Sequence, residues 1–168
     1  MRNFKTILWL VIIFLLQTVV LSRVHFMGAV VSLVLPYIIC VTMLENEFRR
    51  AVSVSVVCAL AAGALCGRNF AVTVLFYVYA PMLIFVIRDK PLYIHQFFKT
   101  LFWTFISSGV LEIIYYAVRN MSLNAGMLLY NALPTAVINT LFVLLVYPLL
   151  KKTMYKEKKK KLLIGDLV

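Results

Sequence analysis

Glu112 is the one acidic residue that the sequence places inside a long apolar segment, in the stretch SSGVLEIIYYAVRN. An ionisable group at the centre of a bilayer costs roughly 2.5–3.5 kcal/mol on insertion scales, so it should face protein or water. Ser108 precedes it, and Tyr115, Tyr116 and Arg119 follow it, at helical spacings of three and four on the same side of a helix. Such a carboxyl group could relay protons or contact a substrate, or it could act as a polar pin between two helices. The pin is favoured, because a relay usually needs further titratable partners and no other acid is predicted within the bilayer.

A second polar set interrupts the last apolar stretch, MLLYNALPTAVINTLFVLLVYPLL. Asn131, Thr135 and Asn139 are four residues apart and therefore share one helix face. Pro134 lacks a backbone donor and can kink the helix. We expect this polar face to meet the Glu112 face of the preceding segment. Each interhelical hydrogen bond contributes only ~0.6 kcal/mol, but several together would fix how the two helices are rotated.

Small residues recur every four positions in a third segment, at Ala51, Ser55, Ala59, Gly63 and Gly67. Overlapping small-xxx-small motifs let two helix backbones approach closely inside a membrane. The face could pack against a helix of the same chain or against the span of a partner. Packing within the chain is favoured, since every multi-span bundle needs such contacts.

Other chemistry-bearing residues are few and isolated. Cys40, Cys58 and Cys66 lie in apolar stretches without a CxxC pair, which is typical of small buried hydrophobic residues. His25 and His95 stand alone between the apolar segments. No HExxH, Walker A, GxSxG or GxGxxG motif is present. The sequence therefore predicts no catalytic set, no metal site and no cofactor.

The elements that must position these residues are transmembrane helices. The chain has 168 residues, is 64% hydrophobic and only 14% charged, and has a mean hydropathy of +0.98. This leaves too little polar surface to cover a globule in water, so we expect an all-α integral membrane protein. A spanning helix needs about 20 mainly apolar residues. The sequence predicts one transmembrane domain, 1–150, with spans at about 6–22, 28–44, 51–66, 70–87, 100–118 and 126–150.

The orientation follows from the basic residues between these spans. If the N-terminus is cytoplasmic, each predicted outer loop carries one basic residue: Arg23, Arg68 or Arg119. All the other lysines and arginines then lie on the cytoplasmic side, as the positive-inside rule requires. The sequence thus predicts six spans with both termini in the cytoplasm.

Residues 151–168 form a predicted basic cytoplasmic tail, KKTMYKEKKKKLLIGDLV. Near an anionic leaflet each lysine is worth on the order of 1 kcal/mol. The tail could be an anchor that lies on anionic membrane lipids, or a dock for an acidic cytoplasmic partner. The anchor is favoured, because such flanks are common in membrane proteins. Nucleic-acid binding is not expected, because Tyr155 is the only aromatic residue among the lysines.

Three stretches together resemble the rod shape-determining protein MreD family: LPTAVINTLFVLLVYP, VLEIIYY and FLLQTVVLSRVHF. The resemblance covers most of the chain and includes the basic C-terminal end. Members often show a Pro-Thr pair followed by an Asn in the last helix, as Pro134, Thr135 and Asn139 do here. One feature departs from the family, whose third span often ends in an Asp. The matching stretch here is AAGALCGRNF, with Cys66 or a neighbour at that place, so no site residue is carried over to it.

The resemblance implies a six-helix bundle similar to the S components of energy-coupling-factor transporters. It also implies a non-enzymatic scaffold in the bacterial cytoplasmic membrane that belongs to the cell-elongation machinery. The expected partners are an MreC-like bitopic protein and, with it, RodA, a penicillin-binding transpeptidase and MreB.

The alternative is that the chain is itself a vitamin-binding S component. S components often carry a small-residue face on the first helix, whereas ILWLVIIFLLQTVVL is bulky throughout. They also tend to have substantial outer loops, and the predicted outer loops here are short. Both features favour the scaffold. An intramembrane enzyme would need a catalytic partner for Glu112, which the pattern does not offer.

Overall fold

The computed structural model describes residues 2–20, 32–65, 69–88, 95–120 and 125–165. Side chains are described for all of these except 2–5, 20, 120, 125, 127–129 and 154–165. Throughout the described ranges the regular structure is helical, with no strand. The elements, in chain order, are α1 (Arg2–Leu15), the π-helical turn η1 (Leu16–Val20), α2 (Val34–Leu44), α3 (Phe48–Leu65), α4 (Phe70–Arg88), α5 (Gln96–Asn120) and α6 (Ala125–Gly165).

Four of the described helices are long and apolar enough to cross a membrane. Their qualifying stretches are Phe48–Leu65, Phe70–Arg88, Gln96–Arg119 and Tyr130–Thr153. These helices confirm the predicted all-α class and a protein suited to a membrane. Two shorter apolar helical stretches, Thr6–Val19 and Val34–Leu44, lie within the first two predicted spans.

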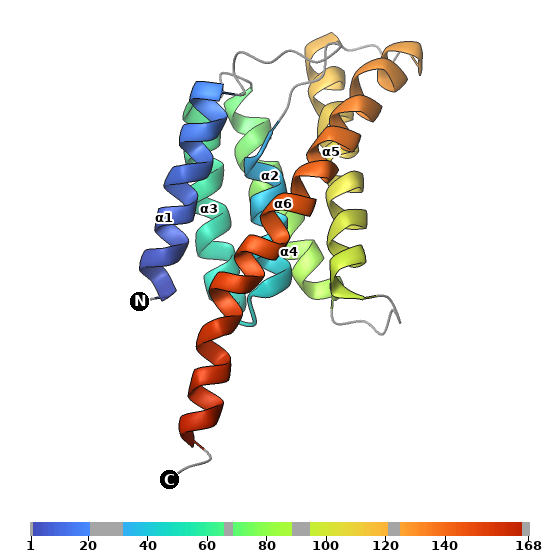
Figure 1. The fold of residues 1–168 in the computed structure, drawn as a ribbon. Helices are drawn as coiled ribbons and strands as arrows, with labels where there is room; N and C mark the ends of the chain where they lie inside the picture. Colours follow the sequence, from blue (N-terminus) through green and yellow to red (C-terminus); the bar gives the residue numbers. More distant parts are fainter. Residues whose placement is uncertain (1, 21–31, 66–68, 89–94, 121–124, 166–168) are drawn as a thin grey trace.

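The shortest helix, α2, forms the centre of the bundle. Every residue from Val34 to Met43 is buried, and α2 contacts all the other helices (Figure 1). A helix that is apolar on every side belongs in a protein interior. At 1.5 Å per residue α2 is about 16 Å long, roughly half the hydrocarbon thickness. The predicted second span, 28–44, therefore begins too early, because Ser32 and Leu33 precede the helix; residues 28–31 lie outside the described ranges.

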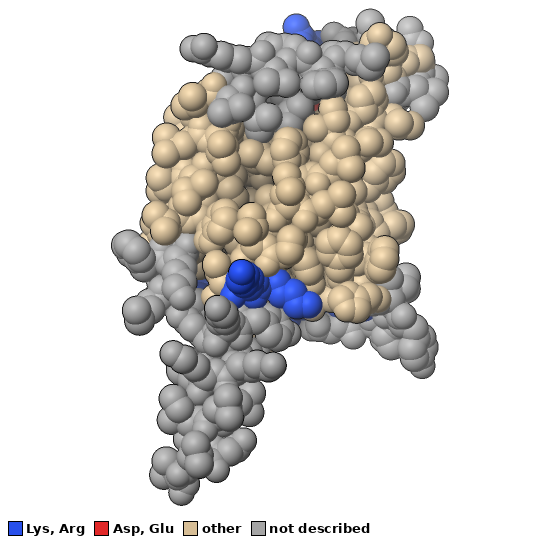
Figure 2. All heavy atoms as spheres, in the orientation of Figure 1, with Lys and Arg blue, Asp and Glu red and all other residues tan. Residues whose placement is uncertain are grey.

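The surrounding helices turn large apolar side chains outward. Leu15 of α1 is 58% exposed and Leu83 of α4 is 63% exposed, and α3, α5 and α6 also carry exposed large apolar side chains. Figure 2 shows a face that is almost free of charged residues across the middle of the molecule. Lys and Arg gather at its edges, chiefly at the lower one. Such a surface fits a hydrocarbon environment.

The hairpin of α3 and α4 is built on the predicted small-residue face. Ser55, Ala59 and Gly63 are buried. A Cβ atom added at Gly63 would lie 2.8 Å from the Phe70 ring and 3.1 Å from a methyl carbon of Val74, both on α4. At its Gly63 end this face packs within the chain, the favoured of the two interpretations. Gly67 lies outside the described residues.

The last helix, α6, does not end where the last span was expected to end. The predicted boundary at residue 150 is close to the end of the apolar stretch at Thr153, but the helix continues to Gly165. It contains Pro134 and Pro148 and is continuous through both. In Figure 1 the C-terminal part of α6 projects beyond the ends of the other helices, at the end of the bundle where the N-terminus also lies.

Candidate functional site

The N-terminal end of α2 lies in the protein interior, where its free backbone donors need partners. The residue before the helix, Leu33, makes no side-chain cap. Instead the Leu33 N–H donates to Gln17 Oε1 at 2.7 Å, and the Ser32 N–H donates to Asn139 Oδ1 at 2.9 Å. A buried N–H without a partner costs about 1–3 kcal/mol, so two amides from distant elements replace the missing local cap.

Asn139 connects this helix end to the rest of the bundle. It is 2% exposed, and its Nδ2 donates to Ser108 Oγ on α5 at 3.3 Å. Ser32 Oγ and Tyr77 OH of α4 share a further hydrogen bond of 3.1 Å. One amide side chain thus fixes the start of α2 against α5 and α6, and Ser32 extends the network to α4.

The C-terminal end of α2 is bound in a corresponding way. Arg88 Nη1 donates to the Thr42 carbonyl at 2.8 Å and also to the Glu45 carbonyl. Gln96 Nε2 donates to the carbonyl of Met43. The last carbonyls of a helix lack partners within it, and a cation there also complements the helix dipole. We call Gln17, Arg88, Gln96 and Asn139 the α2-capping residues.

The first helix reaches the bundle through polar contacts at two levels. Gln17 belongs to the π-helical turn η1, a type of turn that is frequent at functional positions. Nearer the N-terminus, Tyr37 OH of α2 donates to the Thr6 carbonyl at 3.1 Å. Between these levels Ile13 and Phe14 are buried, whereas the opposite side of α1 is apolar and exposed. The first helix is therefore positioned mainly by its contacts with α2 and with the residue before it.

The structure brings part of the two predicted polar faces together. The pair that meets is Ser108 and Asn139, on the most extensive helix pair of the bundle, α5 and α6. Thr135, one turn before Asn139, is 2% exposed, and its Oγ1 atom has no hydrogen-bond partner among the described residues. Asn131 and Pro134 are half-buried.

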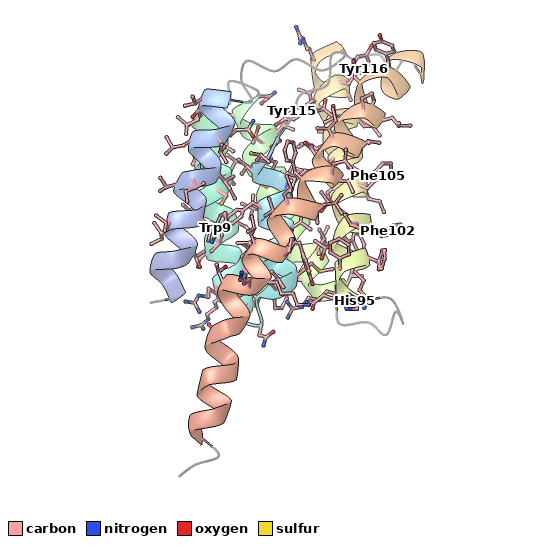
Figure 3. All side chains as sticks on the ribbon, in the orientation of Figure 1. Trp9, His95, Phe102, Phe105, Tyr115 and Tyr116 are labelled. Carbon is pink, nitrogen blue, oxygen red and sulfur yellow. The ribbon has the colours of Figure 1, made fainter. Side chains whose placement is uncertain are left out.

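The remaining predicted residues lie nearer the other end of α5. Glu112 and Tyr116 are half-buried. Tyr115 OH and Thr73 Oγ1 of α4 form a hydrogen bond of 2.5 Å. Figure 3 shows Tyr115 and Tyr116 near the end of the bundle opposite His95. This end of α5 therefore joins α4 through Tyr115, a residue that was placed on the Glu112 face but not proposed as a contact.

Comparison with known protein families, with curated proteins and with solved structures finds no match. No group of three His, Cys, Asp or Glu residues that could hold a metal ion is found among the described residues.

Sequence reasoning missed three of the four α2-capping residues. Gln17 offered a signal, because it is a lone amide inside the apolar run FLLQTVVL. Arg88 was interpreted only as a charge that sets orientation, and Gln96 was not singled out. Their role depends on a helix end that lies 46 residues away from Arg88 in the chain, which spacing within one segment cannot reveal.

Proposed function

We propose that this chain is a non-enzymatic scaffold of the bacterial cytoplasmic membrane that acts in the cell-elongation machinery, as its resemblance to the MreD family implies. In this proposal α1 with η1, α2 and the four long helices make up a six-helix membrane domain. The observation that carries the proposal is the bonding of Asn139. Its amide oxygen accepts from the Ser32 N–H, and its amide nitrogen donates to the Ser108 hydroxyl.

A site for a substrate or a proton needs polar atoms that remain available to it. In this bundle the α2-capping residues bind the backbone at the two ends of the central helix. These bonds hold α2 in one position relative to η1, α4, α5 and α6. A rigid bundle of this kind supports a role in holding partners in register more than a role in capture or catalysis.

The distribution of charge supports a cytoplasmic location for both termini. At the end of the bundle where α3 begins and α4 ends, the described side chains include Arg49, Arg50 and Arg88. Lys99 near the start of α5 and Lys151 of α6 add to the same end. The opposite end has Arg119 at the end of α5. The positive-inside rule assigns the more basic end to the cytoplasm.

The partners proposed are those that the resemblance implies. An MreC-like bitopic protein would bind in the membrane, with RodA, a penicillin-binding transpeptidase and MreB in the same assembly. Anionic lipids would surround the lysines where α6 leaves the bilayer, beginning with Lys151 and Lys152.

One observation favours the alternative, an S component of an energy-coupling-factor transporter. The Thr135 hydroxyl is buried without a hydrogen-bond partner among the described residues, and Asn131 beside it on the same face is half-buried. A small polar ligand between α5 and α6 would bind such groups. In that case Thr135, and not Asn139, would determine activity.

Affinity capture of the tagged chain from gently solubilised native membranes separates the two proposals. We expect an MreC-like protein to be recovered, and its recovery to fall with Asn139→Leu but not with Thr135→Val. Recovery of paired ATPases with a transmembrane coupling subunit would overturn the scaffold. Deletion of the gene should turn rod-shaped cells round, and unchanged rods would also count against the proposal.

A further inference from the structure

Tyr79 places a hydroxyl group on the outside of the bundle, at the middle of a helix that is long and apolar enough to cross a membrane. Its side chain is 60% exposed, and it lies nine residues from each end of the 19-residue helix α4. At 1.5 Å per residue, about 13 Å of helix lies on either side of it. A tyrosine side chain is much shorter than this distance. The hydroxyl therefore does not reach the headgroup region, where the exposed tyrosines of membrane proteins gather.

The hydroxyl of Tyr79 faces away from the protein. Tyr77, two residues earlier, is buried and shares a hydrogen bond with Ser32. Two positions along a helix are 200° apart, so Tyr79 is turned outward, and within the described ranges nothing hydrogen-bonds its hydroxyl. Acyl chains offer neither donors nor acceptors, so an uncompensated polar group in hydrocarbon is costly. The outer face of α1 differs, because its large exposed side chains, from Ile7 to Leu15, are all aliphatic and suit lipid.

The residues around Tyr79 form a continuous apolar face of α4. Val72, Leu75, Tyr79, Met82 and Val86 are spaced alternately three and four residues apart, and we call them the α4 seam. None of the five is buried, and the buried residues of α4 all lie on its other side. The seam of a two-stranded coiled coil has this spacing, and a single polar residue within such a seam sets the register and the number of helices. Tyr79 occupies that position here.

We propose that the α4 seam is the contact surface between two copies of this chain, related by a two-fold axis normal to the membrane. Copies in one membrane have the same orientation, so the two α4 helices run parallel and Tyr79 meets Tyr79 at the same depth. A phenol hydroxyl both donates and accepts, so each copy supplies the partner that lipid cannot. Residues 70–87 include no charged residue that would repel the second copy. The inference goes beyond the proposed scaffold, because it rests on α4 crossing a membrane and not on the cell-elongation assembly.

The first test measures self-association of the purified full chain, with no other protein present. Copies that carry a donor or an acceptor fluorophore on an N-terminal tag are reconstituted in phosphatidylcholine vesicles, and energy transfer is followed as lipid is added. We expect Tyr79→Phe, which keeps the ring, to weaken pairing about threefold, the effect of one interhelical hydrogen bond.

Tyr130→Phe is the matched control for this test. Tyr130 is 66% exposed, but it is the first residue of the apolar stretch of α6 and not a central one. Its replacement should leave the affinity between copies unchanged. No energy transfer by the parent chain, or equal affinities of the parent chain and Tyr79→Phe, would overturn the proposal. Failure of the scaffold proposal would leave these results unaffected.

The second test locates the contact in cell membranes. Val86 of the α4 seam and Ile7 of α1 are both exposed, and each is replaced by Cys in the full chain. These chains also carry Cys66→Ser, whereas Cys40 and Cys58 remain buried. A short bifunctional thiol reagent should join Val86→Cys copies into a dimer of this chain and should not join Ile7→Cys copies. Equal dimer yields at the two positions, no dimer of Val86→Cys, or attachment of Val86→Cys to a different protein would overturn the proposal.

Discussion

The central helix α2 and the hairpin of α3 and α4 show two different ways of holding helices together in one bundle. The hairpin connects neighbours in sequence, and its contact depends on close packing at Gly63 against Phe70 and Val74. Helix α2 is too short to span, and its ends are bound by side chains that come from η1, α4, α5 and α6. A helix whose ends lie inside protein needs polar partners for its backbone, whereas a spanning helix can end in the headgroup region.

The largest effect is expected where one buried side chain binds polar groups of two other elements. Asn139→Leu leaves the Ser32 N–H and Ser108 Oγ without their partner. We expect the free energy of unfolding to fall by about 3 kcal/mol for the two groups together. Thermal unfolding in mild detergent checks this result. The matched control is Thr140→Val, because among the described residues the Thr140 hydroxyl bonds the Ala136 carbonyl of its own helix and no other helix. Equal losses in the two variants would mean that Asn139 contributes no more than an ordinary polar residue of α6.

The C-terminal end of α2 should respond somewhat less. Arg88→Gln removes the guanidinium that binds the carbonyls of Thr42 and Glu45. We expect a loss of about 2 kcal/mol, because the carbonyls of these two buried residues lose their partner. Arg119→Gln, at the opposite end and exposed, is the control and should be nearly neutral. A comparable loss of stability in Arg119→Gln would show that the loss of a positive charge, and not the loss of the hydrogen bonds to the end of α2, causes the effect of Arg88→Gln.

A larger side chain at Gly63 should be enough to disrupt the hairpin of α3 and α4. Gly63→Leu places atoms where Phe70 and Val74 already lie. We expect a loss of about 1–2 kcal/mol, because the Phe70 ring is 52% exposed and can turn aside. Gly109→Leu is a sharp control, since an added Cβ there meets nothing within 4 Å. If both leucine variants unfold at the same temperature, the small-residue face is not a tight contact.

The smallest effect is expected at Glu112. It is half-buried, on the part of α5 that joins α4 through Tyr115. If it is a neutral pin, Glu112→Gln keeps its hydrogen bonding and should cost less than about 1 kcal/mol with little loss of partner capture. Complete loss of function at normal membrane abundance would contradict the pin and indicate a role for the charge.

The sequence predicts the hairpin of α3 and α4 better than it predicts the central helix α2. Apolar length and spacing were sufficient for α3 to α6 and for the small residues of α3, and of the two predicted polar faces they placed one contact, Ser108 with Asn139. The start of α2 could not be predicted, because Ser32 and Leu33 are as compatible with a helix as their neighbours. What ends the helix there is the pairing of their N–H groups with Gln17 and Asn139, which only the tertiary fold brings near. The length of α6 was also missed, because a change from apolar to charged residues marks the membrane boundary and not the helix end.

Hydrogen–deuterium exchange of the first turn of α2 tests the central claim most directly. Asn139→Ala should raise the exchange rate of the Ser32 amide and of the following turn by about tenfold, since an N–H that loses its partner costs about 1–3 kcal/mol in this account. Exchange in α3 should stay unchanged. Equal exchange in the variant and the parent protein, or an increase spread evenly over α2 and α3, would contradict the account that distant side chains hold the ends of the central helix.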